Sequence, residues 1–177
     1  MILIFYLLMC VSALAQVGQH PPAPPVSGNF VYVEQVGDGN VITVDQMDSD
    51  HKQAAIINQG NNNFLEILQS GSANHTAIIT QQYPNAQNNN NTLGIIQTGT
   101  GAHTASIILT NPAANSNNTA SITQAGNAGA EKQFTLQLNG SGIGAQVIQD
   151  NLLTPDRGSM AITCVAPPCS GYSYVKH

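Results

Sequence analysis

Apolar and polar residues alternate along the chain in short segments between residues 29 and 149. In the first segment, every second residue from Asn29 to Gln35 falls on one face and the residues between them fall on the other. A period of two is typical of a β-strand, in which successive side chains point to opposite faces. Asparagine runs at 61–63 and 88–91 flank segments rich in β-branched residues, which favours turns and strands over helix. The pattern therefore predicts short strands.

A seven-residue unit of this kind recurs ten times, and nine of the ten units end in glutamine. A β-branched residue stands two positions before each end. The units end at Gln35, Gln46, Gln59, Gln69, Gln81, Gln97, Leu109, Gln124, Gln137 and Gln149. A unit this short cannot bury its apolar side alone, because only stacked neighbours can cover it. The repetition therefore predicts a solenoid.

Glycines mark the connections between units. The spacing Gln-x-Gly occurs at 35–37, 69–71, 97–99 and 124–126, where glycine can take the positive φ angle of a sharp turn. Gly37 and Gly60 are each followed three residues later by asparagine, which defines a Gly-x-x-Asn arch. Two units joined by an arch form one U-shaped repeat. We therefore predict an all-β fold, a β-solenoid of five stacked strand-arch-strand repeats with amyloid-like cross-β stacking.

Stacking of successive repeats about 4.8 Å apart would place equivalent residues in columns. The opening positions of the second strands give Asn40, Asn63, Asn91 and Asn118. The opening positions of the first strands give Asn29, Gln53, His75, His103 and Glu131. The closing glutamines give two further columns, interrupted only by Leu109. Stacked amides hydrogen-bond along the axis, so we expect these columns to form ladders.

Apolar positions between the polar columns predict a thin, dry core. On the first strands these positions are Val31, Ala55, Ala77 and Ala105. On the second strands they are Ile42, Leu65, Leu93, Ala120 and Ala145. Small side chains would thus face larger ones across the core.

The pattern Asn29-x5-Gln35-x-Gly37-x2-Asn40-x-Ile42-x3-Gln46 resembles the curlin repeat of the curli subunits. Residues 53–69, 75–97, 103–124 and 131–149 follow this pattern with looser arches. The chain departs from the family pattern in three ways. Asn, Gln or His replaces the opening Ser, Leu109 replaces a Gln, and Gln133 occupies an apolar position.

The resemblance implies a functional amyloid, a secreted subunit exported through an outer-membrane pore and assembled on a nucleator into extracellular fibres for cell adhesion and biofilm. Such a pilus-like fibre is a homopolymer. Two alternatives stay open. The first is a monomeric β-solenoid binding module, although the outward positions lack a regular row of Thr or aromatic residues. The second is a minor nucleating or accessory curli-like subunit.

The first 28 residues divide into two segments. Residues 1–15 combine an apolar run with a terminal Ala-Leu-Ala, which predicts a signal peptide cleaved before Gln16. Residues 16–28 are rich in proline and are expected to be extended. Residues 29–149 hold the repeats, and residues 150–177 form a tail or cap. After cleavage no stretch approaches the roughly 20 apolar residues of a membrane span.

Charge is sparse, with a formal net charge of −5 and only four Lys and Arg residues. A nucleic-acid surface needs a basic patch, so we expect no nucleic-acid partner. His75 and His103 share a predicted column, but no third metal ligand joins them there. Carboxylates do not pair at a predicted cleft, and no phosphate-binding loop is present. We therefore expect neither an enzyme nor a cofactor.

Cys164 and Cys169 remain after removal of the leader, on either side of the segment Val-Ala-Pro-Pro. An oxidising compartment favours a local disulfide between them, with free thiols and an intermolecular bond as the alternatives. Residues 158–164 retain the strand spacing, with Met160 and Ile162 at the apolar positions. The tail is therefore expected to add one more strand and to cap the stack.

Overall fold

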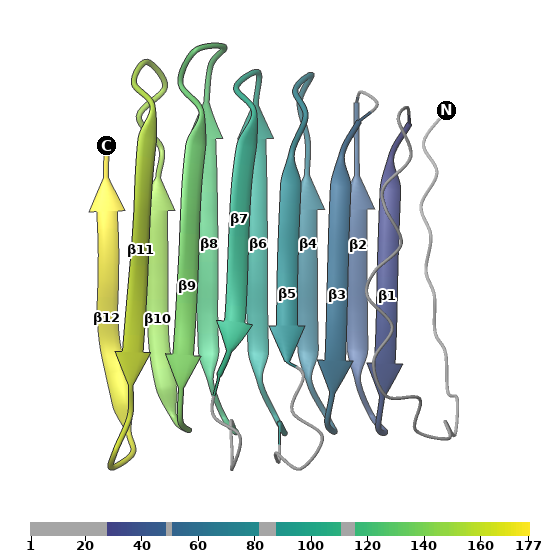
Figure 1. The fold of residues 1–177 in the computed structure, drawn as a ribbon, viewed down its shortest axis with the longest axis vertical. Helices are drawn as coiled ribbons and strands as arrows, with labels where there is room; N and C mark the ends of the chain where they lie inside the picture. The colour runs from purple at the N-terminus through teal and green to yellow at the C-terminus, as the bar shows by residue number, and fades with distance from the viewer. Residues whose placement is uncertain (1–27, 49–50, 82–87, 111–115) are drawn as a thin grey trace.

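The computed structural model describes residues 28–48, 51–81, 88–110 and 116–177, and these residues contain strands and turns but no helix. The predicted signal peptide and all but the last residue of the proline-rich segment lie outside the described residues. The chain folds into twelve strands in two six-stranded sheets (Figure 1). No helix in the described part of the chain is long and apolar enough to cross a membrane.

Odd-numbered strands form one sheet and even-numbered strands form the other, each in chain order. The first sheet contains β1 (Phe30–Val36), β3 (Gln53–Gln59), β5 (Thr76–Gln81), β7 (His103–Leu109), β9 (Lys132–Asn139) and β11 (Asp156–Thr163). The second contains β2 (Val41–Gln46), β4 (Phe64–Gln69), β6 (Thr92–Gly99), β8 (Thr119–Gly126), β10 (Ile143–Gln149) and β12 (Cys169–Lys176). Every pairing is parallel.

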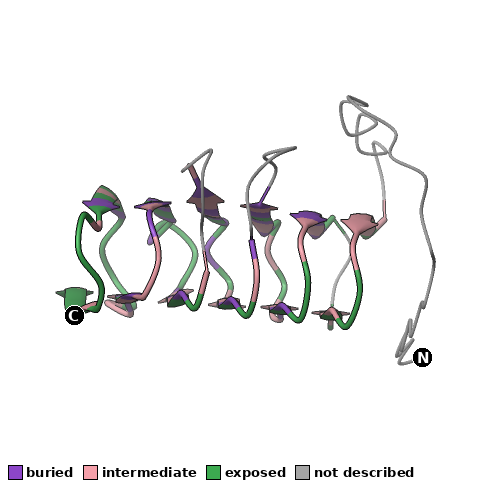
Figure 2. Cartoon of the chain, turned by 90° about the horizontal axis from the view of Figure 1, so that it is seen from below, coloured by how far each residue is buried: buried purple, intermediate pink, exposed green. Residues whose placement is uncertain are grey.

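The two sheets lie face to face as two layers joined by arches, so each strand pair is one turn of a solenoid (Figure 2). Inner strands such as β4, β7 and β8 bury alternate residues toward the opposite sheet, as the period of two predicts. The predicted all-β solenoid is thus confirmed. The chain climbs by one strand spacing at each turn, so the two described ends of the stack lie far apart.

The core consists of apolar columns that run along the stack. Ile67, Ile95 and Ile122 occupy one column in the second sheet, and all three are fully buried. Ile56, Ile79 and Ile107 occupy the matching column in the first sheet. A β-branched side chain has few rotamers in a strand, so stacking identical residues costs little side-chain entropy.

The second repeat is displaced by one residue from the predicted phase. Ala54 and Ile56 point into the core, whereas the sequence pattern predicts Ala55 at this position. The turn explains the displacement, because Gly60 stacks directly under Gly37 and places Asn58 under Gln35. The arch glycine fixes the register here, and not the closing glutamine.

The fifth repeat is also displaced by one residue from the predicted phase, but toward the C-terminus, whereas the second repeat is displaced toward the N-terminus. Phe134, Leu136 and Leu138 are buried, and Gln133 and Gln137 point outward. Gln133, which breaks the apolar pattern in the predicted phase, therefore lies outside the core. Phe134 fits because the residue below it is Gly158, and the ring packs against Tyr174 at a centroid distance of 4.8 Å.

The tail contributes two strands, whereas the sequence pattern predicts one. β11 pairs with β9 and β12 pairs with β10, so both sheets gain a strand. The β10–β12 pairing shifts register between Ile143 and Ala145. The last turn thus continues the stack with a less regular edge.

Ile79→Ala should lower the free energy of unfolding by about 3 kcal/mol, because Ile79 is fully buried and its loss leaves a cavity. Ile78→Ala is the matched control, since Ile78 is 37% exposed on the outer face of the same strand. We expect a loss below about 1 kcal/mol for the control. Urea unfolding of both variants measures the difference, and equal losses would contradict the assigned phase of β5.

Candidate functional site

Five glutamines form a continuous ladder at the ends of the second-sheet strands. Each donates a side-chain N–H to the side-chain oxygen of the next glutamine, at distances of 2.8 to 2.9 Å. The ladder runs through Gln46, Gln69, Gln97, Gln124 and Gln149. It ends where Gln149 donates to the Asp156 carboxylate at 2.8 Å.

The same glutamines also bond across the core to the opposite sheet. The second Nε2 hydrogen of each of the first four donates to a backbone carbonyl at the start of a first-sheet strand, at 3.0 to 3.2 Å. Gln97, for example, bonds Gln124 along the stack and the Thr76 carbonyl across it. Both amide hydrogens are thereby satisfied, which a buried side chain requires.

The four predicted asparagines form a second ladder of a different kind. The backbone N–H of each lower residue donates to the Oδ1 of the asparagine above it, at 2.9 to 3.0 Å. The donors are Asn63, Asn91 and Asn118, and Ile143 continues the series at 2.9 Å. The side-chain Nδ2 groups of Asn40, Asn63 and Asn118 donate to arch carbonyls. The column therefore joins the strands to the arches.

The first-sheet closing column differs from the predicted one. It contains Gln35, Asn58, Gln81 and then Leu109 and Leu138. Gln59 and Gln137 are predicted ladder residues, but both point out of the core. The correction has the same cause as the shifts described above, because Gly60 and Gly140 each follow the closing residue by two positions. No ladder bond between the side chains of this column is present in the described residues.

The opening column of the first sheet contains fewer amide side chains than the other polar columns. It contains Asn29, Lys52, His75, His103, Lys132 and Asp156. Lys52 and Lys132 replace the predicted Gln53 and Glu131, and both lysine residues are buried. Each lysine donates to a backbone carbonyl of an arch, Gly71 for Lys52 and Asn151 for Lys132, both at 2.7 Å. The ammonium groups thus take the place of the amides that serve the arches elsewhere.

The predicted arch glycines Gly37 and Gly60 lie in one column with φ angles of 109° and 140°. A Cβ on Gly37 would stand 2.2 Å from the Gly60 carbonyl oxygen, and one on Gly60 would stand 1.9 Å from the Asn88 carbonyl oxygen. The backbone of one arch therefore rests on the backbone of the next. Glycine is required at both positions by its φ angle and by this contact.

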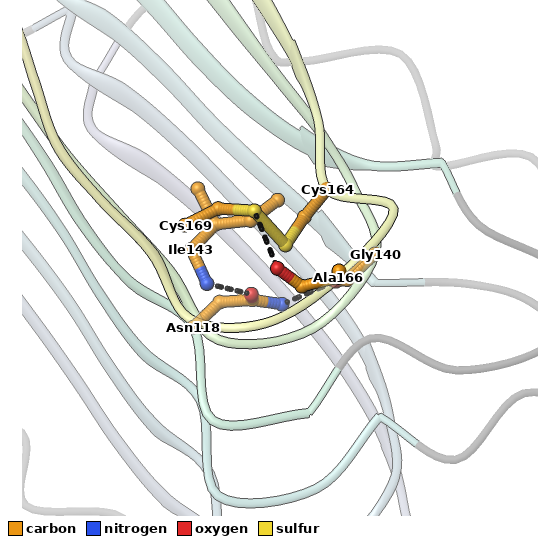
Figure 3. Close-up of a disulfide and its surroundings, with 6 residues drawn as sticks. All are labelled: Asn118, Gly140, Ile143, Cys164, Ala166 and Cys169. Atoms are coloured by element: carbon orange, nitrogen blue, oxygen red, sulfur yellow. Dashed lines mark hydrogen bonds between the residues drawn. A yellow bond between two sulfur atoms is a disulfide. The ribbon is translucent and has the colours of Figure 1, made fainter.

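A disulfide joins Cys164 and Cys169 across the arch between β11 and β12, with a Cα–Cα distance of 5.8 Å. Of the three predicted alternatives for these cysteines, the structure contains the local bond. Cys169 lies below Ile143, next to the end of the asparagine ladder at Asn118 (Figure 3). The disulfide therefore closes the arch where no further asparagine is available to hold it.

The two ends of the stack differ in charge and in exposure. Residues 28–48 carry four carboxylates, at Glu34, Asp38, Asp45 and Asp48, and no Lys, Arg or His. The last turn carries Arg157 and Lys176 against one carboxylate, Asp156. Burial alone would raise the pKa of Asp156, but hydrogen bonds from Lys176, Gln149 and Tyr174 hold it below its usual value. This carboxylate is therefore ionised and internally paired at neutral pH.

Core positions of the first turn are exposed because nothing in the described residues stacks above them. Val31 is 48% exposed and Val33 is 37% exposed, although both belong to columns that are fully buried in the turns below. In the described part of the chain, no three or more His, Cys, Asp or Glu side chains converge in a way that could hold a metal ion.

Gln97→Ala should destabilise the fold by about 3 kcal/mol, because it leaves Gln69, Gln124 and the Thr76 carbonyl without their partner. Gln137→Ala is the control, since Gln137 is exposed, and we expect a change within about 0.5 kcal/mol. Urea unfolding measures both. A control that loses as much stability as Gln97→Ala would show that Gln137 belongs to a ladder after all.

Gly60→Ala should cost about 2 kcal/mol or more, because the new methyl group meets the Asn88 carbonyl and the φ angle is unfavourable. Gly129→Ala separates the two effects. Gly129 also has a positive φ, of 86°, but no atom lies within 4 Å of the place that its new methyl group would take. We expect about 1 kcal/mol for this control in thermal unfolding. A similar loss for both variants would exclude arch contact as the cause.

Comparisons of the chain with family models, with curated proteins and with solved structures found no match. The columns and the two ends of the stack are therefore the features from which a function can be argued.

Proposed function

We propose that this protein is a secreted structural subunit that self-assembles into curli-like amyloid fibres on the bacterial cell surface. The fibres would support adhesion and the biofilm matrix. The homopolymer would grow by head-to-tail addition, with the first turn of one subunit docking on the last turn of another. A nucleator subunit and an outer-membrane export pore are the partners that the resemblance to the curlin repeat implies.

The observation that carries this proposal is the pair of open sheet edges. In the described residues, β1 pairs only with β3 and β2 only with β4, while β11 and β12 pair only with β9 and β10. Each edge strand presents unpaired backbone groups, and a parallel strand of a second copy has the geometry to pair with them. Because successive turns are displaced along one axis and do not form a ring, repeated addition of subunits gives an open filament.

Side-chain columns at the first turn also favour addition. No residue in the described chain donates to the Gln46 side-chain oxygen, which is the acceptor end of the glutamine ladder. Continuing the parallel register would bring Lys176 of a second copy into the column of Gln46, because Lys176 lies under Gln149 in the same column. The ammonium group would then donate to that oxygen.

Charge supports the same polarity of addition. The first turn carries four carboxylates, and the last turn carries Arg157 and Lys176. Opposite charge favours contact between the first turn of one copy and the last turn of the next, and it disfavours contact between two first turns. This preference weakens as salt screens the charges.

Thioflavin fluorescence and electron microscopy of the mature chain, with and without preformed seeds, test the proposal. We expect a lag phase that seeds abolish and unbranched fibres. A chain that stays monomeric would instead support a β-solenoid binding module. A chain that accelerates the assembly of another subunit without seeding itself would support a nucleating role.

Val33→Lys should reduce the seeded elongation rate at least tenfold, because docking would bury an unpaired ammonium group in the core column. The variant should still fold, since Val33 is 37% exposed at the end of the stack. Gln146→Lys is the matched control, because Gln146 is an exposed outward residue of β10, which is paired on both sides by β8 and β12. We expect this control to elongate within about twofold of the unchanged chain.

Circular dichroism of both variants verifies that they are folded before elongation is measured. Unchanged elongation of folded Val33→Lys would mean that the first turn is not a docking surface. Equal slowing by both variants would indicate a general effect of added positive charge.

A further inference from the structure

The buried histidines His75 and His103 lie one above the other in the opening column of the first sheet. Their rings are parallel to within 14°, with centroids 5.1 Å apart. His75 is fully buried and His103 is 1% exposed. No part of the stacking scheme requires histidine, because Asn29 occupies the same column in the first repeat.

Hydrogen bonds leave little room for a second proton on His103. Its Nε2 lies 3.0 Å from the Thr98 carbonyl oxygen, so this nitrogen carries the hydrogen. Its Nδ1 accepts the backbone N–H of Lys132 at 3.1 Å. The lone pair on Nδ1 is therefore used by a bond between neighbouring strands, and a proton on Nδ1 would face that N–H.

His75 is held in the same orientation. Its Nε2 lies 2.9 Å from the Ser70 carbonyl oxygen in the arch between β4 and β5. Both rings thus donate to an arch carbonyl, but only His103 also accepts a hydrogen bond at Nδ1, because Nδ1 of His75 is buried without a hydrogen-bond partner among the described residues.

Charged groups of both signs surround the pair, but its direct neighbours in the column are lysines. Lys52 lies above His75 and Lys132 lies below His103 in the same column. Glu131 is adjacent to Lys132, Asp156 lies below it, and Asp48 accepts the Gly71 N–H near the His75 arch at 2.9 Å. From the opposite side of the core, the residues that bond to β5 and β7 are the uncharged Asn91, Gln97 and Gln124. Two lysines therefore flank the pair within the column.

Burial is the main reason that protonation is unfavourable. It lowers the pKa of His75, and the charge of Lys52 lowers it further, against the Ser70 hydrogen bond. Burial and then the proximity of His75 lower the pKa of His103 to about 4. His103 therefore stays neutral in the folded chain well below the pH at which a free histidine charges, and the pKa of His75 is shifted in the same direction.

We propose that the His75–His103 pair is an acid-sensitive lock on the third and fourth repeats, which holds them stacked at neutral pH and releases them in mild acid. Release begins when His103 Nδ1 takes a proton from solvent and loses the Lys132 N–H bond. The imidazolium then stands in a buried column beside His75, Lys52 and Lys132. Separation of β5, β7 and β9 relieves this charge. We also expect fibre assembly to stop in acid, and this part of the proposal rests on the proposed function.

The sign of the pH effect follows from the lowered pKa values. His103 binds a proton near pH 6.5 in the unfolded chain but only near pH 4 in the folded chain. Its contribution to stability is therefore complete above pH 6.5 and is lost as the pH falls from 6.5 toward 4. For His103 alone, this difference makes opening about thirtyfold more favourable at pH 5 than at pH 7.5. The urea midpoint should fall by about 1 M.

The double variant His75→Asn/His103→Asn tests the proposal. Asparagine fits this column, because the Oδ1 of Asn29 accepts the Lys52 N–H at 3.0 Å as His103 Nδ1 accepts the Lys132 N–H. His51→Asn/His177→Asn is the matched control, since both of these histidines are exposed. We expect the first variant to lose the pH dependence of the urea midpoint between pH 7.5 and pH 5, and the control to keep it.

Hydrogen exchange followed by mass spectrometry locates the opening in the unmodified chain. After correction for the intrinsic exchange rate, the protection factors of peptides from β5, β7 and β9 should fall about thirtyfold between pH 7.5 and pH 5. The protection factors of peptides from β4 should fall by less. Uniform loss across the stack would overturn the proposal, as would an unchanged pH dependence in the histidine-free column. This measurement needs no fibres, so it separates failure of the lock from failure of the proposed assembly. If only assembly fails, the exchange result is unaffected.

Discussion

Every side chain in this fold must be compatible with a neighbour of the same kind one strand spacing away. Parallel in-register pairing imposes this constraint, because it places equivalent residues of successive turns directly above one another. Amides satisfy it well, since each carries both a donor and an acceptor. Isoleucine satisfies it in the core, since one branched side chain packs on another in the same rotamer. The composition, with 7% charged residues, follows from the same constraint because like charges in one column repel.

The stacking constraint also explains how much of the fold could be predicted from the sequence. Period-two segments, the pairing of units and the asparagine positions are all local patterns, and each leads directly to a strand or an arch. The register of the second and fifth repeats is the exception. Glutamine at 59 and 137 suggests one phase, but the glycines at 60 and 140 stack on other arches and impose the neighbouring phase. A Cβ at these two positions would lie 1.9 to 2.6 Å from a backbone carbonyl oxygen of the next arch, so only glycine fits there. A glutamine that points out of the core meets no such restriction.

The glycine spacing is nevertheless present in the sequence. Asn58-Gln59-Gly60 and Leu138-Asn139-Gly140 have the same two-residue offset as Gln35-Val36-Gly37. Aligning the glycines, and not the glutamines, gives the observed columns. The second strand of the tail could not have been found in this way, because β12 contains Tyr172 and Tyr174 at the core positions and a register shift near Cys169. There the disulfide and the Phe134–Tyr174 contact replace the ladders.

Columns that depart from amides show what the fold requires at each corner. At the opening position of the first sheet, asparagine, lysine and histidine each reach an arch carbonyl or a neighbouring backbone N–H, whereas Asp156 in the last turn bonds to side chains instead. The requirement is therefore a hydrogen bond at the corner, which several side chains can supply, and the choice among them sets the charge of the interior. An amide column responds weakly to pH. A column that places two imidazoles between two ammonium groups keeps the same bonds at neutral pH, but its stability depends on those imidazoles remaining neutral. Histidine in place of asparagine therefore changes the response of the fold to acid without changing its shape.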